Sequence, residues 1–269
     1  MPYIIGFVIA LFIALTGVGA GTITVPILVL FLKVPAPIAV GIGLTFSAAI
    51  KLILVPVQIV RGNIAWRTLG YMLLGGAPGV LLGSLLLKQL VTANAGNVLN
   101  AVLGFILVGT ASWQIVFSFR TIQHNAERRD RSRFLAALMF PVGAEVGFSS
   151  AGAGALGSAA LLSLTPLLPA QVVGTDIAFG FLVSLLGSGL HVLSGASDWP
   201  LLLQLTAGGV LGASAGTVLS RSIPRRPLRL ALWAWLFILG GQFIFVSYRA
   251  FAAPRESNHQ IVSTAKNHM

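Results

Sequence analysis

The sequence contains no cysteine and very little charge. With Cys 0 among 269 residues, it excludes disulfides and thiolate metal sites, and it leaves the redox compartment open. Charged residues make up only 9% of the chain, whereas hydrophobic residues make up 56%. A soluble domain could not place that much apolar surface in its interior, so we expect an integral membrane protein. The apolar runs are long and continuous, which predicts an all-α polytopic fold.

Acidic residues are much scarcer than basic ones. The chain has Asp+Glu 6 against Lys+Arg 17, a net charge of +11. In a soluble protein this balance would suggest nucleic-acid binding. Here most arginines lie in short connections between apolar runs, where positive charge fixes orientation in the bilayer. We therefore expect a multi-pass protein with a lipid bilayer as its environment and no nucleic-acid partner.

Two signatures of common enzymes are absent, the zinc motif His-Glu-x-x-His and the Walker phosphate loop. Ser149 and Ser150 lie in apolar sequence, but His191, the one histidine inside an apolar run, has no further support as the base of a dyad. The sequence therefore predicts no enzyme, no cofactor and no metal site. An intramembrane hydrolase is kept as the weaker alternative.

The chain contains apolar runs of two lengths. A helix that spans a membrane needs about 20 residues. Six runs are long enough, at 38–60, 68–87, 98–119, 172–193, 199–219 and 228–246. Four shorter runs form two pairs, 4–15 with 23–32 and 134–148 with 155–168. Because no member of a pair can cross alone, we expect each pair to form a broken span or a re-entrant hairpin.

Glycines interrupt each short pair. The first break reads Gly17-Val-Gly-Ala-Gly-Thr-Ile-Thr-Val-Pro26, and the second reads Gly147-Phe-Ser-Ser-Ala-Gly-Ala-Gly-Ala-Leu-Gly157. Glycine costs about 1 kcal/mol relative to alanine in a helix interior, so helix propensity does not explain these runs. Two such breaks at corresponding positions of two halves indicate the binding site of a transporter.

The two halves are repeats. A shift of 133 residues aligns 19–21 with 152–154, and the glycines of 75–83 with those of 208–216, without a gap. The alignment also pairs a tryptophan with a tryptophan. We therefore expect a first membrane repeat at 1–119, a basic cytoplasmic linker at 120–133, a second membrane repeat at 134–250 and a polar tail at 251–269.

Positive charge predicts how the halves are oriented. The arginine-rich segments 120–133 and 221–229 should both be cytoplasmic, so an even number of crossings must separate them. Two clear spans lie between them, and a re-entrant hairpin adds no net crossing. Each half then contains a glycine-broken re-entrant helical hairpin plus three transmembrane helices. Because three is odd, the halves are predicted to be two inverted repeats.

The helices that resume after the breaks would begin with free backbone N–H groups and positive dipole ends. Inverted symmetry would bring these helix starts together at the midplane of the bilayer. We therefore predict an anion site formed by backbone groups and nearby hydroxyls. The predicted substrate-binding residues in the breaks are Gly19, Gly21, Thr22, Thr24, Ser149, Ser150, Gly152, Gly154 and Ala155. The alternative is that the glycines only allow close helix packing, which suits Gly75, Gly79 and Gly83 better.

One lysine, two acids and one histidine inside the apolar runs are candidates for function. Lys51 lies about 15 Å of helix from Arg61, too deep to reach water easily, so it needs an anion or a carboxylate. We predict that it adds charge to the substrate cavity or pairs with Glu145 or Asp176. The two acids could also couple transport to protons, and Asp176, near a predicted helix start, could cap that helix. His191 lies near the end of a run, where we expect interfacial exposure.

The paired motifs at 17–26 and 147–157, each at the start of one half, resemble those of the TauE/SafE sulfite exporter family, and the likeness covers essentially 4–250. The resemblance implies a bacterial inner-membrane carrier that exports a small sulfur oxyanion, sulfite or an organosulfonate. The chain differs at Ala20, which interrupts what is often a continuous glycine run. A carrier or channel for another small anion or solute stays open as the alternative, and so does a homodimer.

Overall fold

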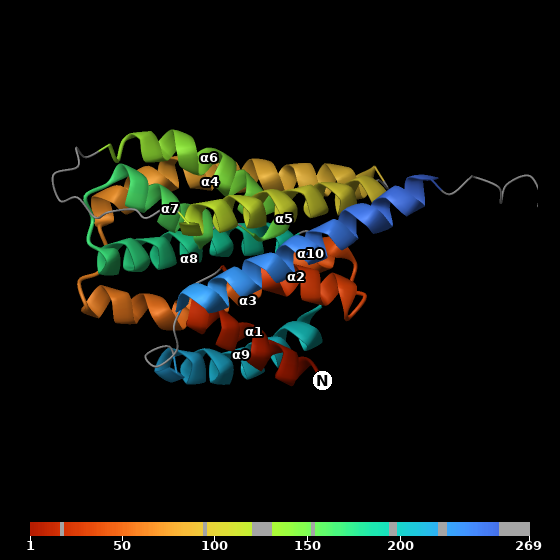
Figure 1. Ribbon diagram of the computed structural model, residues 1–269, viewed down its shortest axis with the longest axis horizontal. Coiled ribbons are helices and arrows are strands. Elements are labelled where there is room, and N and C mark those ends of the chain that lie inside the picture. Colours follow the sequence, from red (N-terminus) through yellow and green to blue (C-terminus); the bar gives the residue numbers. More distant parts are fainter. Residues whose placement is uncertain are drawn as a thin grey trace, which may run out of the picture.

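The computed structural model describes residues 1–16, 19–93, 96–119, 131–151, 154–193, 198–219 and 225–252. All regular secondary structure in these ranges is helical, which confirms the predicted all-α fold. The first half contains α1 (Pro2–Thr16), α2 (Ala20–Leu30), α3 (Ala36–Val60), α4 (Trp66–Thr92) and α5 (Gly96–Phe119). The second half contains α6 (Phe134–Ser149), α7 (Ala155–Leu164), α8 (Pro169–Leu193), α9 (Trp199–Leu219) and α10 (Arg225–Ala252). Together they form an elongated bundle (Figure 1).

Helix lengths follow the apolar runs. Five described helices are long and apolar enough to cross a membrane, namely α3, α4, α5, α8 and α10. α9 has 21 residues and coincides with the predicted run 199–219. The helices α1, α2, α6 and α7 are shorter, with 15, 11, 16 and 10 residues. Each predicted short pair is therefore present as two helices separated at its glycine break.

Two helices end earlier than their apolar runs, α2 by two residues and α7 by four. The run 155–168 predicts a helix to residue 168, but α7 ends at Leu164. Proline at 166 disfavours helical backbone at the residue before it, and Thr165 is extended, with φ −129° and ψ 153°. The Thr165 hydroxyl still donates to Leu161 O at 2.6 Å, which closes the last turn. The four residues 165–168 instead connect α7 to α8.

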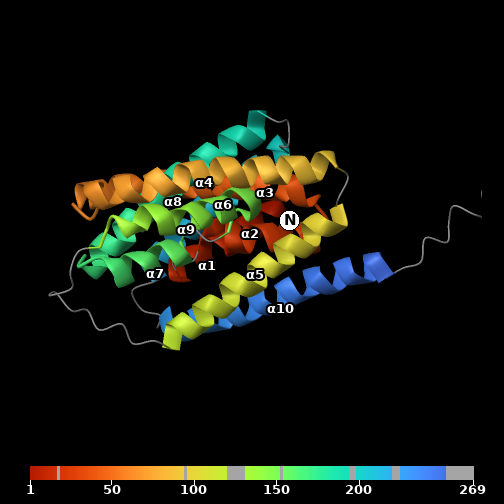
Figure 2. The ribbon, with the colours of Figure 1, turned by 90° about the horizontal axis from the view of Figure 1, so that it is seen from above.

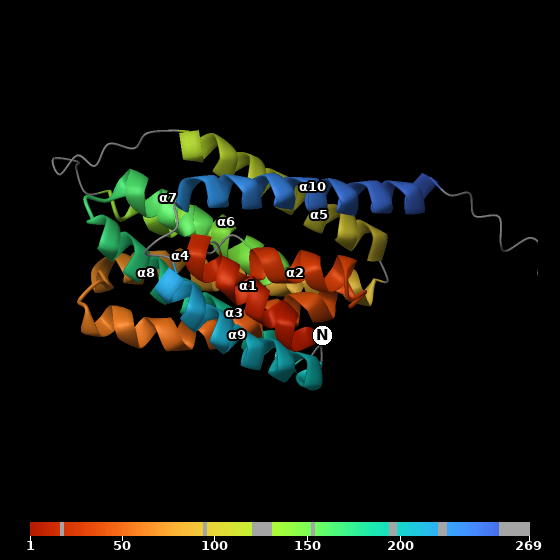
Figure 3. The same ribbon diagram turned by 60° about the horizontal axis from the view of Figure 1, so that its bottom comes forward.

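Helices of one half pack along helices of the other. α4 lies along α6, and α1 lies along α9, as Figures 1 and 3 show. Both contacts depend on glycine, because a Cβ at these positions would crowd or overlap the facing helix. The glycines of α4 are Gly75, Gly79 and Gly83, which face Ala136, Phe140 and Ala144, and those of α9 are Gly208, Gly212 and Gly216, which face Tyr3, Phe7 and Leu11. The same 133-residue shift relates every contact of the first set to one of the second.

The glycines of α4 thus serve close helix packing, as the sequence suggested for them. Their repeat counterparts on α9 serve the same purpose. Small residues let two backbones approach, and the dispersion attraction between them replaces the hydrophobic effect, which is absent between helices in lipid. Each half therefore packs its first helix on the other half, α1 on α9 and α6 on α4. The spacing of the glycines permits both contacts.

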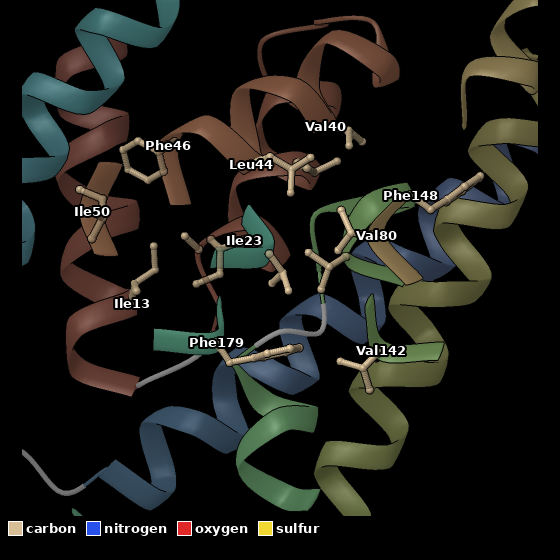
Figure 4. Packing of buried hydrophobic residues seen from close by; sticks show 14 of the residues in the cluster. Ile13, Ile23, Val40, Leu44, Phe46, Ile50, Val80, Val142, Phe148 and Phe179 are labelled. Carbon is tan, nitrogen blue, oxygen red and sulfur yellow. The ribbon is translucent and has the colours of Figure 1, made fainter. Parts of the chain in front are cut away.

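Two phenylalanines lie at the centre of the core (Figure 4). Phe46 of α3 and Phe179 of α8 are fully buried, and the 133-residue shift relates them. The ring of Phe179 packs on Gly76 of α4, and the ring of Phe46 packs on Gly209 of α9. The pair α3 and α8 therefore forms the middle of the bundle, flanked by α4 with α6 and by α9 with α1.

The outer surface of the bundle is apolar. α5 and α10 lie side by side at one edge, as Figure 2 shows. On the outward faces of α4, α5 and α9, Leu74, Phe105 and Leu203 are 68%, 65% and 67% exposed. Exposed apolar surface on this scale is unfavourable in water, whereas it is the normal contact of a helix with lipid. The described helices therefore form a multi-pass membrane protein.

Several predictions fall outside the described residues. Most of the linker 120–133 does, and so do Gly17 and Gly152 of the breaks. The predicted tail 251–269 also lies outside, except that α10 continues to Ala252.

Candidate functional site

The two glycine breaks lie against each other. A Cβ built on Gly19 would lie 3.3 Å from the backbone nitrogen of Gly154 and 3.8 Å from its Cα. A Cβ on Gly21 would overlap the carbonyl and the hydroxyl of Ser150. The first turn of α2 therefore contacts both the end of α6 and the start of α7. The absence of side chains at Gly19 and Gly21 is what permits this approach of the two halves.

Ser150 ends α6 in an uncommon conformation. Its backbone is left-handed, with φ 62° and ψ 1°, where non-glycine residues are rarely found. Its side-chain Oγ is buried and has no hydrogen-bond partner in the described part of the chain. Gly43 of α3 lies beside it, since a Cβ there would lie 3.0 Å from Ser150 Oγ. Buried hydroxyls normally have a partner, so this one can accept a ligand as the missing partner.

Both helices that begin at the breaks lack a side-chain cap. The N-cap residues are Gly19 for α2 and Gly154 for α7, and neither helix start has a side-chain capping hydrogen bond. The first amides of a helix have no acceptor within it and form the positive end of its dipole. One of the predicted amides is already bonded, because the Thr22 N–H donates to Gly19 O at 3.2 Å. Ala155 is the first residue of α7. The arrangement can accommodate an anion.

Two other predicted hydroxyls are already hydrogen-bonded. Thr24 Oγ1 donates to Ala20 O at 2.7 Å within α2. Ser149 Oγ donates to Glu145 O at 2.9 Å and accepts from the Ala151 N–H at 3.2 Å. Each hydroxyl has a single hydrogen, so neither side chain is free to donate to an anion without first breaking its bond. Ser150 is therefore better placed as a donor than these two.

Asp176 lies beside the start of α7. The prediction that it caps its own helix is wrong, because α8 begins at Pro169 and Asp176 lies inside it. Its Oδ2 accepts a hydrogen bond from Ser158 Oγ of α7 at 2.7 Å. Its Oδ1 lies against Gly157 and has no hydrogen-bond partner among the described groups. A carboxylate in this position is stabilised by the positive end of the α7 dipole.

Lys51 of α3 is directed toward α8. Its side chain is 8% exposed, and a Cβ on Gly180 would lie 2.5 Å from its Nζ. Gly180 is one helical turn from Asp176, and the charges of Asp176 and Lys51 interact. Glu145 lies elsewhere, in a cleft whose lining residues include no basic side chain. Of the two acids that the sequence allowed as neighbours of Lys51, Asp176 is therefore the one on the helix that Lys51 faces.

A row of hydroxyl contacts continues along the interface between α3 and α8. Ser47 Oγ lies 3.1 Å from Ser184 Oγ, and Thr45 Oγ1 lies 2.7 Å from Ser188 Oγ. Residue numbers fall along α3 as they rise along α8, so the two helices are antiparallel. Sequence reasoning missed this row because serine and threonine are scattered through the apolar runs and no spacing marks the paired ones.

The residues considered for hydrolysis do not form a dyad. His191 is 5% exposed, so its predicted interfacial exposure is wrong; it lies on the packed face of the last turn of α8, whereas Leu193 is 86% exposed. Its Nδ1 lies 2.9 Å from Gly187 O, and Ser149 Oγ donates to Glu145 O. Both side chains thus bond to backbone carbonyls of their own helices. No contact of Ser149 or Ser150 with His191 is found in the described part of the chain, so nothing there favours a hydrolase.

A serine motif that the sequence reasoning overlooked lies in α9. The residues Gly212-Ala-Ser-Ala-Gly216 match the Gly-x-Ser-x-Gly pattern of serine hydrolases. In those enzymes the serine occupies a sharp turn between a strand and a helix, whereas here the whole motif is helical. Ser214 Oγ donates to Val210 O at 2.8 Å on an exposed face, and the two glycines pack on α1. The motif is therefore a packing motif.

Glu145 lines a cleft that is separate from the contact between the two glycine breaks. Its carboxylate lines a cleft of ≈ 340 Å³ between α5 and the junction of α6 with α7, together with Trp113 and Leu156. Gly19, Gly21 and Ser150 do not line this cleft. The two acids predicted for proton coupling therefore occupy different environments, and only Asp176 lies on the helix that Lys51 faces.

An apolar outer surface, five helices long enough to span a bilayer and buried charges around uncapped helix starts are typical of a multi-pass membrane transporter. Comparison with known families agrees with this class. The chain belongs to the TauE/SafE sulfite exporter family, whose model matches residues 3–243. The resemblance read from the two glycine motifs is thereby confirmed.

Two relatives come from Bacillus subtilis (strain 168). The chain is 28% identical to the probable membrane transporter protein YjnA over 209 residues, which cover 74% of this chain and 82% of YjnA. It is 29% identical to the probable membrane transporter protein YunE over 109 residues, 40% of each chain. No solved structure matches the chain. The family and both names indicate a membrane transporter rather than an enzyme.

Proposed function

We propose that the chain is a secondary transporter that exports a small sulfur oxyanion, sulfite or an organosulfonate, across the cytoplasmic membrane. The anion binds where α2 and α7 begin, to backbone N–H groups and to the Ser150 hydroxyl. The observation that carries the proposal is the contact between two uncapped helix starts at Gly19 and Gly154, with the partnerless Ser150 Oγ beside them. Free amides with positive dipole ends bind anions at other helix N-termini.

The proposal includes two inverted repeats with re-entrant breaks. α3 and α8 hold corresponding places in the two halves, and their paired serines and threonines run in antiparallel order. If both helices cross the bilayer, the halves have opposite orientations. The short helices on either side of each break are too short to span alone, which favours hairpins that enter and leave on one side. The repeats correspond to 1–119 and 134–250.

In the proposed mechanism, Lys51 supplies positive charge and Asp176 is its resting counter-ion. Asp176 lies at the start of α7, where its carboxylate interacts with the same positive dipole end that would bind a substrate anion. A substrate anion would compete with this carboxylate for Lys51, and protonation of Asp176 would relieve the repulsion between the two anions. Proton coupling through Asp176 is thus part of the proposal.

The experiment is efflux from proteoliposomes that contain the purified chain. Liposomes loaded with sulfite should lose it at a rate that depends on the protein, whereas liposomes loaded with choline or glucose should not. Loss of one hydrogen bond to an anion costs about 1.5–3 kcal/mol, so Ser150→Ala should slow sulfite efflux about tenfold or more. The matched control is Ser214→Ala, which removes a hydroxyl from the outer face of α9. Equal rates for the two variants, or no sulfite efflux, would reject the proposal.

A further inference from the structure

The cleft beside Glu145 lies outside the site proposed for the anion. It has a volume of ≈ 340 Å³, which is within the range of small-molecule sites. α5 supplies one wall, and α6 and α7 supply the other. The lining residues are Ile106, Gly109, Thr110, Trp113, Glu145 and Leu156. None of them is basic, so a positively charged occupant would find no repelling group in the wall.

The carboxylate of Glu145 lacks a partner. Its Oε1 is buried and makes no hydrogen bond within the described part of the chain. Thr110, the other oxygen-bearing side chain of the wall, already donates its hydroxyl hydrogen to Ile106 O at 2.6 Å. An ionisable group in apolar surroundings within a membrane is costly unless it is paired. A cation next to Glu145 would pair this carboxylate.

The remaining wall shows which cation fits. A metal ion would need about six oxygen ligands, but among the lining side chains only Glu145 and Thr110 carry oxygen. Trp113 instead presents an aromatic ring, which attracts organic cations through its π-face. Ile106 and Leu156 add apolar surface for the body of such a molecule. The wall suits an ammonium group attached to a small apolar body.

Access to the cleft is from the lipid side. Trp113 is 58% exposed on the outer surface of the bundle. Glu145 is the twelfth residue of α6, which places it about 16 Å along the helix from Phe134. At that depth a phospholipid headgroup with its phosphate would be deep in hydrocarbon. A compact cation without a phosphate that partitions into the bilayer does not have this difficulty.

We propose that this cleft binds an apolar ammonium compound from the bilayer, with Glu145 as the counter-ion and Trp113 as the cation–π partner. The ammonium group lies against the Glu145 carboxylate, and the apolar body fills the space between α5 and α7. This site does not depend on the proposed anion transport.

The test uses benzyltrimethylammonium and the full chain in lipid nanodiscs, with binding measured by calorimetry. Neopentylbenzene, in which a carbon replaces the charged nitrogen, is the neutral probe of the same shape. The cation should bind at least tenfold more tightly than the neutral probe. Glu145→Gln should weaken cation binding at least tenfold, whereas Asp198→Asn, which removes an exposed carboxylate at the start of α9, should leave it unchanged.

A second variant tests whether the cation binds in this cleft, without changing the charge of Glu145. A Cβ on Gly109 would have nothing within 4 Å, so Gly109→Leu can fill the cleft without a clash and with Glu145 intact. It should abolish binding, whereas Gly241→Leu, also in open space but on α10, should not. The proposal is overturned by equal binding of both probes, by no binding of the cation, or by full binding to a folded Glu145→Gln or Gly109→Leu chain.

Discussion

Ser47 and Ser184 face each other across the interface of α3 and α8, with their hydroxyl oxygens 3.1 Å apart. The 133-residue shift relates Ser47 to Gly180 and Ser184 to Lys51, and Lys51 also lies against Gly180. One contact is therefore serine with serine, and its repeat counterpart is lysine with glycine. Gly180 leaves room for the longer side chain of Lys51. One of the two related contacts therefore holds a buried positive charge, and the other holds none.

The first prediction uses the absence of natural cysteine. The double variant Ser47→Cys with Ser184→Cys should form a disulfide on oxidation, because the two oxygens already lie 3.1 Å apart. If α3 and α8 separate during transport, the bond should stop sulfite efflux, and a reducing agent should restore it. The single variants under the same oxidant are the controls. Full efflux by the cross-linked chain would mean that this interface stays closed during transport.

The second prediction concerns Lys51 and Asp176. Lys51→Met should slow efflux at least tenfold and lower the free energy of unfolding by about 3 kcal/mol, because it leaves a buried carboxylate without its cationic neighbour. Adding Asp176→Asn should recover most of the stability, since both charges are then removed. Efflux should remain low in the double variant. Thermal unfolding in detergent and proteoliposome efflux measure the two effects.

A stability loss in Lys51→Met with normal efflux would show that Lys51 has only a structural role. Recovery of both stability and efflux in the double variant would lead to the same conclusion. The two measurements therefore separate the alternatives that the sequence left open for Lys51.

The third prediction concerns the packing glycines of α4. Gly75→Ala should destabilise the chain by about 1–3 kcal/mol, because the added Cβ overlaps the carbonyl of Ala136 and forces α6 away. Gly70→Ala is the matched control in the same helix, where a Cβ has nothing within 4 Å. It should be neutral or stabilising by up to about 1 kcal/mol, because alanine favours helix. Thermal unfolding of the two variants should shift in opposite directions or by clearly different amounts.

The fourth prediction separates the backbone of Ser150 from its hydroxyl. Ser150→Gly relieves the left-handed conformation at φ 62° and should raise stability by about 1 kcal/mol, whereas Ser150→Ala keeps the unfavourable conformation. Both remove the hydroxyl, so both should slow efflux to a similar extent. Efflux that follows stability instead, with Ser150→Gly as active as the natural chain, would show that the hydroxyl does not bind the substrate.

Much of the fold could be read from the sequence because membrane helices need long apolar runs. The boundaries of α9 agree with the predicted run to the residue. The separation of α1 from α2 and of α6 from α7 followed from glycine, which is unfavourable in a helix interior. The early end of α7 was missed, although Pro166 was visible, because the run of apolar residues continued past it.

The contact between the two breaks was predictable from the sequence, whereas the positions of Asp176 and His191 were not. The contact of Gly19 with Gly154 follows from repeated glycines and the expected symmetry. Asp176 was placed at a helix start because the run 172–193 omits the first turn of α8, which contains Pro169 and Gln171. His191 was placed at the interface because distance to the end of a run does not report which face of a helix is packed.

The packing of α1 on α9 and of α6 on α4 also bears on how the two halves depend on each other. In this arrangement, removal of either half would uncover a glycine-lined strip of main chain on the other. The two halves therefore form one structural unit, and neither keeps its own set of helix contacts when the other is taken away.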